Sequence, residues 1–221
     1  MPQKSSLFVA SVAVMACGVL FALGVSVVGA NKKPQSSDDN QKNQIAEPLS
    51  APTLTFINPK RGASEPKVTI FVYGDYGCAA CRTLESTLNG VLAKTTDVAV
   101  VWKDMPNEVA HAGSGDAAVA ARCAQQQGAF WDYHDLLFAQ AEGFSVNSFV
   151  AMAQALDLDA QTFGDCISNQ ATRPLVVRDI DEALRLGITA TPFLFIGDRR
   201  VSGAIEASAI EGLISEARRS K

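Results

Sequence analysis

The spacing of hydrophobic and polar residues divides most of the chain into three parts. Residues 7–30 carry no charge, residues 32–51 are rich in Asn, Gln, Ser, Asp and Lys, and from residue 53 onward apolar and polar positions are mixed. In this last part, short apolar runs typical of strands lie near both ends, and helix-like periodicity fills the middle. The pattern predicts an α/β domain whose sheet comes from two separate stretches of sequence, with a helical block inserted between them.

The individual elements follow from the same patterns. Strands are expected at residues 53–57, 68–73, 97–102, 192–196 and 199–202. Helices are expected at residues 78–93, 117–127, 130–141, 145–156, 161–169, 172–186 and 206–219. Pro174 then falls in the first turn of its helix, and Gly187 ends that helix. The predicted order is β-β-α-β, the helical block, and α-β-β-α.

The N-terminal part predicts a membrane segment and a tether. An uncharged run of this length can span a bilayer and exceeds the usual core of a signal peptide, so an uncleaved anchor at residues 1–31 is the first expectation. Cleavage after the small residues 28–30 is the alternative, and a loose lipoprotein box ending at Cys17 is a further one. Apolar sequence continues past Cys17, which favours a membrane-embedded cysteine. Residues 32–52 are expected to form a flexible polar linker.

Composition narrows the class of protein and its compartment. The 221 residues carry a net charge of −4, and scattered basic residues are outnumbered by acidic ones, which argues against nucleic-acid binding. Outside the apolar run there are four cysteines, an even number that suits an oxidising compartment. The positive charges flanking the run are nearly balanced, so this cysteine count decides the predicted orientation. The globular part is expected on the outer side of the membrane.

Two of these cysteines, Cys78 and Cys81, lie at a predicted strand-to-helix junction. Their spacing places both on one face of the first helical turn at a separation that suits a disulfide. The unpaired N–H groups and the dipole of a helix N-terminus favour a thiolate there, so the pair is a candidate redox site. Zinc would need four ligands, and the sequence offers no second such pair. An inert disulfide is the other alternative, although so short a loop adds little stability.

The order of elements and three sequence stretches resemble the thioredoxin superfamily, and specifically the DsbA-like thiol–disulfide oxidoreductases. The stretches are residues 74–81 (GDYGCAAC), 121–138 (ARCAQQQGAFWDYHDLLF) and 187–197 (GITATPFLFIG). The resemblance covers essentially the whole chain from residue 53 onward. It implies a thioredoxin fold at residues 53–221 with a helical insertion at about 107–172.

The resemblance also implies the roles of individual residues. Cys78 is expected to form a mixed disulfide with a client protein, and the more buried Cys81 to resolve it. Pro192 is expected to be cis beside the cysteine pair, leaving the backbone of Thr191 to pair with an extended client segment. We predict that Tyr76 binds the client together with Thr191 and Pro192. The dithiol itself carries the electrons, so neither a bound cofactor nor a metal is expected.

Two departures from the family pattern concern the site. Oxidases of the family often carry Pro-His between the cysteines, whereas Ala79 and Ala80 supply neither charge nor donor, which predicts a less stabilised thiolate and a less oxidising disulfide. Family members also often place a buried acid where this chain has Val72. Asp75 is predicted to take over proton transfer, with a solvated loop acid or a local turn former as equal alternatives.

Cys123 and Cys166 both fall in the helical block, where some relatives have a second, structural disulfide. We expect this bond here, and two buried free thiols are the alternative. His111, Trp131 and His134 match family positions. Trp131 is interpreted as a core residue, and the two histidines as packing or helix-end groups.

The sequence therefore predicts a membrane-tethered thiol–disulfide oxidoreductase of a bacterial cell envelope, facing the periplasm from the inner membrane. Its clients would be exported proteins with cysteines. A membrane redox partner, either DsbB-like and quinone-linked or a reducing equivalent, would reset its state. A dithiol oxidase is the first expectation and an isomerase or reductase the second, because redox poise and partner set the direction. A non-catalytic binding protein with a vestigial cysteine pair is the alternative from another class.

Overall fold

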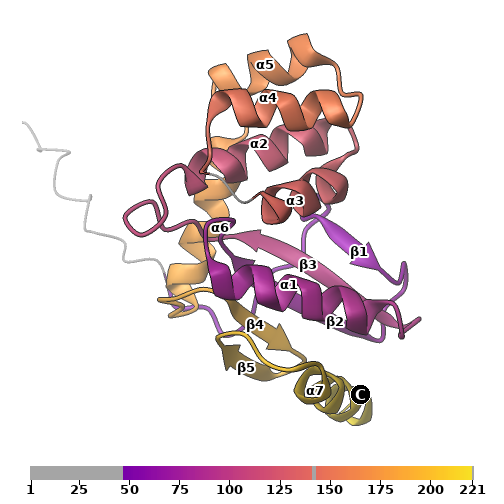
Figure 1. Ribbon diagram of the computed structural model, residues 1–221. Coiled ribbons are helices and arrows are strands. Elements are labelled where there is room, and N and C mark those ends of the chain that lie inside the picture. Colours follow the sequence, from indigo (N-terminus) through magenta and orange to yellow (C-terminus); the bar gives the residue numbers. More distant parts are fainter. Residues whose placement is uncertain (1–46, 141–142, 221) are drawn as a thin grey trace, which may run out of the picture. The chain divides into compact units, whose positions relative to one another are not determined.

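The computed structural model describes residues 47–140 and 143–220, and the strands within them form one mixed sheet in the order β1-β3-β2-β4-β5 (Figure 1). The strands are β1 (Lys60–Gly62), β2 (Val68–Gly74), β3 (Val98–Asp104), β4 (Phe193–Ile196) and β5 (Arg199–Ser202). β2 is parallel to β3 and antiparallel to β4, so it occupies the centre of the sheet. Two segments far apart in the sequence therefore complete one sheet, as the pattern predicted.

The helices lie close to the predicted positions. They are α1 (Ala79–Leu92), α2 (Ser114–Gln126), α3 (Phe130–Ala139), α4 (Val146–Ala155), α5 (Ala160–Ser168), α6 (Arg173–Arg185) and α7 (Ala207–Arg219). Pro174 is in the first turn of α6, where its missing N–H costs no helical hydrogen bond. No helix among the described residues has the length and apolar character needed to cross a membrane.

Alternation along β2 sets the two faces of the sheet. Val68, Ile70 and Val72 pack into the main core with α1 and α7. Tyr73 points to the opposite face and joins a smaller apolar cluster with Ala183 of α6. Successive side chains of a strand point to opposite faces, and in β2 apolar residues point both ways, as expected for a strand that is buried on both faces. Figure 1 shows α1 in front of the sheet and α6 behind it, with α2–α5 gathered beyond one end.

The helical block lies between β3 and α6 in the sequence and adds its own buried surface to the main core. α2 is its central helix, with an uninterrupted buried run of small apolar residues at positions 117–121. Small side chains allow neighbouring helices to approach α2 closely on several sides. The block is thereby packed directly against the domain that carries the sheet.

The strand expected at residues 53–57 is wrong. This segment is an irregular connection whose backbone is held by side chains of other elements. The Thr53 N–H donates to Glu182 Oε1 at 2.6 Å, and Lys103 Nζ donates to the Thr53 carbonyl at 2.9 Å. The edge strand is instead β1, which pairs antiparallel with β3 from Lys60 to Gly62.

The last residues of the expected flexible linker are also part of the folded unit. The Leu49 N–H donates to the carbonyl of Arg185 at 3.0 Å, and Arg185 Nε donates to the Glu47 carbonyl at 2.8 Å. Leu49 additionally packs against the smaller apolar cluster. The ordered domain thus begins before residue 53. The predicted membrane segment at 1–31 and the rest of the linker lie outside the described residues.

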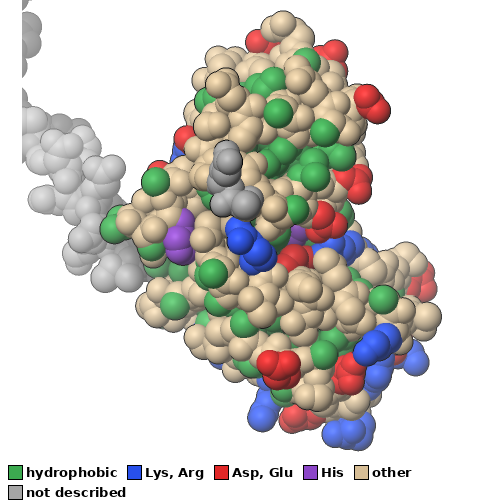
Figure 2. All heavy atoms as spheres, in the orientation of Figure 1, with side chains coloured by type: hydrophobic (Ala, Val, Ile, Leu, Met, Phe, Trp, Pro, Cys, Tyr) green, Lys and Arg blue, Asp and Glu red, His purple; other side chains and the backbone are tan. Residues whose placement is uncertain are grey.

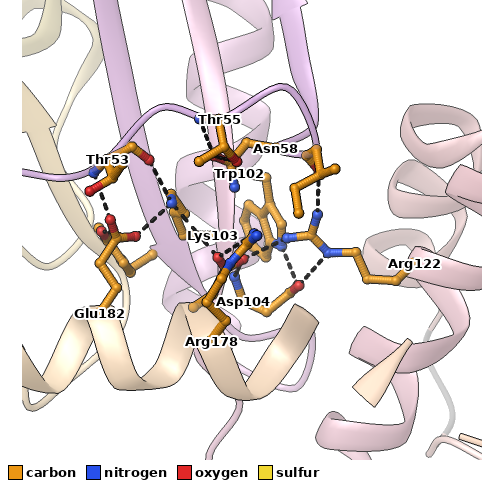
Figure 3. A network of polar contacts seen from close by, with 12 residues as sticks. Thr53, Thr55, Asn58, Trp102, Lys103, Asp104, Arg122, Arg178 and Glu182 are labelled. Carbon is orange, nitrogen blue, oxygen red and sulfur yellow. Dashed lines mark hydrogen bonds and ion pairs between the residues drawn. The ribbon is translucent and has the colours of Figure 1, made fainter. Parts of the chain in front are cut away.

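Charged side chains form a buried network where β3 ends (Figure 3). Arg122 of α2 donates from Nε to Asp104 Oδ2 and from Nη2 to Asp179 Oδ2, each at 2.6 Å. Lys103 Nζ lies 2.5 Å from Glu182 Oε2. All five side chains are at least nine-tenths buried. The network fastens β3 to α2 and α6, and thereby joins the sheet to the helical block.

Candidate active site

Cys78 is the N-cap residue of α1, with an extended backbone. Its Sγ accepts a hydrogen bond from the Cys81 N–H at 3.3 Å and lies 3.6 Å from the Thr191 carbonyl oxygen. The first contact favours a thiolate, because a backbone donor at the positive end of the helix points at sulfur. The second can form only while the sulfur carries a proton. The site therefore offers a partner to each protonation state of Cys78.

No side chain in the first turn of α1 counters the helix dipole at Cys78. That turn contains no acidic residue, and Ala79 and Ala80 are both exposed. Their methyl groups leave the approach to the sulfur uncharged. The helix N-terminus is consequently the main electrostatic feature that α1 itself contributes to the site.

Cys81 is held more deeply than Cys78, with exposed fractions of 2% and 8%. Burial raises the pKa of the Cys81 thiol, and its hydrogen bond with Cys78 raises it further. Both cysteines are free thiols in this structure. A sulfur with a raised pKa stays protonated at neutral pH, so Cys78 is the sulfur better placed to exchange with an external partner.

The Thr191–Pro192 peptide bond is cis, as the resemblance implied. Pro192 is buried just before β4, and Thr191 is half-buried. The Gly203 N–H donates to the Pro192 carbonyl at 2.8 Å, which ties this segment to the end of β5. Thr191 is thereby brought beside Cys78 from a distant part of the sequence.

Asp75 is a buried turn residue, so its interpretation as a solvated loop acid is wrong. Its side chain is fully buried, and Oδ1 accepts from the Gly77 N–H at 2.8 Å. Oδ2 accepts from the Asn107 N–H and lies 2.8 Å from His111 Nδ1. The turn-forming alternative is the one that these contacts describe. Proton transfer by Asp75 stays a prediction.

His111 is a residue that sequence reasoning did not assign to the site. A Cβ atom added at Gly77 would lie 2.4 Å from His111 Cβ, so the histidine packs directly against the residue before Cys78. The His111 side chain remains about one-third exposed. Only the fold brings residue 111 next to residue 77. The match of His111 to a family position was the one available signal.

Tyr76 is not at the surface where client binding was expected. Only 1% of it is exposed, and its ring packs against those of Trp102 and Phe138. Its hydroxyl lies 2.9 Å from His134 Nδ1. The structure thus corrects this assignment: Tyr76 supports the site from inside the core.

His134 connects this aromatic cluster to α1. Burial lowers the pKa of His134 to about 3, helped by the positive charge of Arg61. Neutral imidazole has one donor and one acceptor nitrogen. Nδ1 can accept from the Tyr76 hydroxyl while Nε2 faces Glu85 Oε1 at 3.2 Å. His134 is therefore a packing residue, as interpreted from the sequence, whose Nδ1 is paired with the Tyr76 hydroxyl.

One group of side chains among the described residues has metal-ligand character. Ligand atoms of Glu85, His134 and Asp135 lie within 4.8 Å of one another. The guanidinium of Arg61 contacts both carboxylates and stacks 4.3 Å above the half-buried Trp131 ring. Arg61 already supplies the positive charge that these carboxylates require, so we assign no metal to them.

Cys123 and Cys166 are joined by a disulfide that links α2 to α5. The bond lies inside the helical block. Both cysteines are buried among its apolar side chains. It closes a loop within the block and is separate from the Cys78–Cys81 pair. The structure thus divides the four cysteines into one bonded pair and one pair of free thiols.

The surface around these features is mixed in character. Figure 2 shows acidic and basic side chains interspersed on the face viewed, with neither sign dominating. Hydrophobic side chains gather over the region of the helical block. Apolar side chains of Val146, Phe149, Val150 and Ile167 line a cavity there of about 210 Å³.

The sheet, the helical insertion and the cysteine pair at the start of α1 are arranged as the resemblance to the DsbA-like thiol–disulfide oxidoreductases implied. The family model described as thioredoxin matches residues 57–216, which is most of the described domain. This chain belongs to the thioredoxin family.

Solved structures show the same architecture. The thioredoxin-like oxidoreductase from Silicibacter pomeroyi DSS-3 is 25% identical, with a TM-score of 0.69 over 75% of this chain and 94% of that one. The thiol-disulfide exchange protein alpha-DsbA2 from Wolbachia pipientis is 21% identical, with a TM-score of 0.66 over 73% and 87%. Oxidised BdbD from Bacillus subtilis is 20% identical, with a TM-score of 0.69 over 79% and 100%. These last two likenesses establish the fold.

Curated relatives include much longer proteins. The Na⁺/H⁺ antiporter NhaA 1 of Salinispora arenicola is 31% identical over 157 residues, which are 71% of this chain and 24% of the antiporter. The corresponding protein of Mycolicibacterium gilvum is 29% identical over 171 residues, 74% of this chain and 28% of the antiporter. The chain thus spans about a quarter of the length of the curated relatives it matches.

Proposed function

We propose that this protein is a dithiol oxidase that introduces disulfides into exported proteins, with isomerisation or reduction as the second possibility. The observation that carries the proposal is the position of Cys78. It caps α1, accepts from the Cys81 N–H, and lies beside the Thr191 carbonyl. This arrangement stabilises an attacking or leaving thiolate next to a backbone segment that can hold an extended client.

The oxidation step begins with the Cys78–Cys81 disulfide. A client thiolate attacks Cys78 Sγ, which forms a mixed disulfide and breaks the Cys78–Cys81 bond. Cys81 leaves as a thiolate and takes up a proton, in keeping with its buried position. A second client thiolate then attacks the client sulfur of the mixed disulfide. The client gains a disulfide, Cys78 leaves as a thiolate, and the protein is left reduced by two electrons.

Reduction or isomerisation would use the same atoms in the opposite order. The Cys78 thiolate attacks a client disulfide, and Cys81 then resolves the mixed disulfide by attacking Cys78. The raised pKa of Cys81 suits a residue that stays protonated until that second step. Redox poise and the partner that resets the dithiol choose between the two directions.

Client binding is assigned to the segment before β4. Thr191 lies half-buried beside Cys78, and Pro192 is held behind it by the hydrogen bond from Gly203. An extended client could pair with the Thr191 backbone as an added strand. This would place a client cysteine beside Cys78 without requiring a particular client sequence.

The compartment is inferred from the cysteines and the N-terminus. A structural disulfide such as Cys123–Cys166 supports an oxidising environment outside the cytoplasm. The uncharged run at residues 7–30 supports tethering to the inner membrane. We therefore place the domain on the periplasmic side of a bacterial cell envelope. A membrane partner, DsbB-like or reducing, would restore the active state of the dithiol.

The test is an exchange assay with purified full-length protein and two cysteine variants. Wild type should oxidise a reduced client and catalyse insulin reduction when supplied with dithiothreitol. Cys78→Ser should abolish both activities, and Cys81→Ser should accumulate mixed disulfides between Cys78 and the client. Full turnover by Cys78→Ser would refute the assignment. Absence of exchange by the wild type would favour a non-catalytic binding protein.

The reduction potential of the pair decides the direction. Equilibration with glutathione should give a value near −120 mV for a dedicated oxidase and near −200 mV or below for an isomerase or reductase. The exposed Ala79 and Ala80 give no charge to the thiolate, which predicts a value below that of the strongest oxidases. A value at the reducing end would redirect the search to a reducing membrane partner.

A further inference from the structure

The carboxylate of Asp75 is the hub of the turn that presents Cys78. One oxygen accepts from the Gly77 N–H, and the other accepts from the Asn107 N–H and contacts His111 Nδ1, all at 2.8 Å. The Asp75 carbonyl also accepts from the Cys78 N–H at 3.1 Å. Both backbone donors to the carboxylate are uncharged, so among the described residues His111 is the partner of this carboxylate whose charge can change.

His111 approaches this turn from the loop that follows β3. Its Cβ packs against Gly77, where any side chain would collide with it. Its Nδ1 reaches the buried carboxylate while the side chain stays about one-third exposed. A ring with one nitrogen on a carboxylate and the other side open to water can take up a proton without breaking its contact with Asp75.

The negative charge of Asp75 acts against formation of a second negative charge on Cys78. The carboxylate is buried three residues before the sulfur, in a turn closed by the Cys78 N–H. A buried negative charge on the turn that carries Cys78 disfavours a thiolate, and an imidazolium on the same carboxylate offsets it. The dipeptide between the cysteines supplies no charge of its own, since Ala79 and Ala80 stand there. His111 is thus the cation available to this turn.

We propose that His111 is a positioning residue that controls the redox equilibrium of the Cys78–Cys81 pair by holding and neutralising Asp75. The inference rests on the proposed exchange function and adds a residue that regulates the same site. The titratable groups on the segments around the ring are Asp75, the Cys78 thiol and the exposed Glu108. A positive charge on His111 offsets the charge of Asp75, which stabilises the Cys78 thiolate and makes the Cys78–Cys81 disulfide more oxidising than it would be without this cation.

Two substitutions separate charge from structure. His111→Asn keeps an N–H donor near the position of Nδ1 but removes the cation, so the Cys78 thiolate should become less stable. Asp75→Asn removes the opposing charge, so the thiolate should become more stable. Loss of a merely structural contact would impair the site in both variants. Opposite effects are therefore the signature of the proposed mechanism.

The measurements use the full-length reduced protein in mild detergent. Iodoacetamide labelling of the peptide that carries Cys78 is followed by mass spectrometry between pH 5.5 and 8.5. At pH 6.5 we expect labelling to be at least threefold slower for His111→Asn and faster than wild type for Asp75→Asn. Glu108→Gln removes an exposed acid from the same loop and serves as the matched control, with wild-type rates expected.

Equilibration with glutathione provides the second readout. Protein disulfide and two glutathione thiols exchange to give the dithiol and one glutathione disulfide. His111→Asn should lower this equilibrium constant threefold to tenfold, where tenfold corresponds to about 30 mV. His111→Lys, which keeps a cation at this position, should restore the constant toward the wild-type value.

The outcomes are distinguishable from failure of the proposed function. Unchanged labelling in His111→Asn, or a change of the same sign in both variants, overturns the role of His111. If Asp75→Asn fails to fold, as judged by circular dichroism, His111→Asn and its rescue by His111→Lys decide the question. Wild-type protein that shows no exchange with insulin, together with opposite labelling shifts, would overturn the exchange function while supporting the control of Cys78 by His111.

Discussion

Replacement of Arg122 by methionine should destabilise the domain severely. Arg122 is fully buried, and its guanidinium is shared between Asp104 and Asp179. Methionine has a comparable reach but no charge, so Arg122→Met leaves two buried carboxylates without their main partner. Two cations remain near Asp179: Arg178 lies 3.4 Å away but is more than one-third exposed, and Lys103 lies 3.7 Å away and is already engaged by Glu182.

The expected loss is about 3–5 kcal/mol at pH 7, the range observed when one member of a buried ion pair is removed. Since domains of this kind are stable by about 5–15 kcal/mol, such a loss is a large fraction of the total. The size of this loss reflects the cost of leaving a buried charge without a partner. That cost exceeds the free energy that the hydrogen bonds alone contribute to stability.

The loss should depend on pH in a defined direction. Burial already raises the pKa of Asp179 from its ordinary value of 3.8, and neighbouring Asp104 adds to the effect. Without Arg122 the pKa of Asp179 rises further. The folded variant then retains a proton that the unfolded chain releases, so stability falls as pH rises from about 4 through the folded pKa. The variant should lie closer to wild type at pH 4.5 than at pH 7.

Urea denaturation followed by circular dichroism at both pH values measures the difference from wild type. The control is Arg173→Met, which removes an exposed arginine 2.7 Å from Asp116 and should cost about 1 kcal/mol or less. Adding Asp179→Asn to Arg122→Met should recover part of the loss. If Arg122→Met and Arg173→Met cost the same at pH 7, the reasoning about the buried network is refuted.

Three further predictions concern His134, the Cys123–Cys166 disulfide and two glycines. Because burial lowers the pKa of His134 from 6.5 to about 3, the unfolded state takes up the proton first, and stability should fall as pH drops from 6.5 to 3. In urea titrations, His134→Gln should flatten the dependence of unfolding free energy on pH. A dependence as steep as that of wild type would contradict this prediction. Replacing Cys123 and Cys166 by serine should lower the unfolding free energy by about 4 kcal/mol for a sequence separation of 43, and a loss under about 1 kcal/mol would count against this. Gly74→Ala would place a Cβ 2.2 Å from a buried indole and should cost about 1–3 kcal/mol, whereas Gly90→Ala meets no atom within 4 Å and should stabilise α1 by about 0.5–1 kcal/mol. Thermal unfolding of both glycine variants measures these effects. Shifts of the midpoint in the same direction for Gly74→Ala and Gly90→Ala would exclude this prediction.

The pattern of hydrophobic positions was sufficient for most of the fold. Strand β2 shows why: its alternating residues meet α1 and α7 on one face and α6 on the other, so burial enforces what the pattern indicates. The expected strand at 53–57 failed because an apolar run says nothing about partners. Side chains of Lys103 and Glu182 satisfy the Thr53 backbone there. β1 has three mostly polar residues and gave no signal.

The sequence predicted the site residues that a local motif defines. It did not predict the positions of residues that only the tertiary fold brings together. Cys78 and Cys81 are recognisable because a helix start and a spacing of three residues define them. Tyr76 follows the same strand, but whether an aromatic ring there turns outward or inward depends on the rings that it meets. His111 lies more than thirty residues from Asp75 in the sequence, and only the path of the loop after β3 brings the two together.

The order of strands in the sheet bears on how the chain folds during synthesis. β2 gains its β3 partner within about thirty residues, but its β4 partner, in the register Ile70 opposite Ile196, comes more than one hundred residues later. Contacts of such long range form slowly, because a large loop must close first. Until β4 has been made, the apolar β2 strand presents an open edge, which other chains can occupy. We expect the emerging chain to depend on chaperones or on delayed compaction until its last quarter is available.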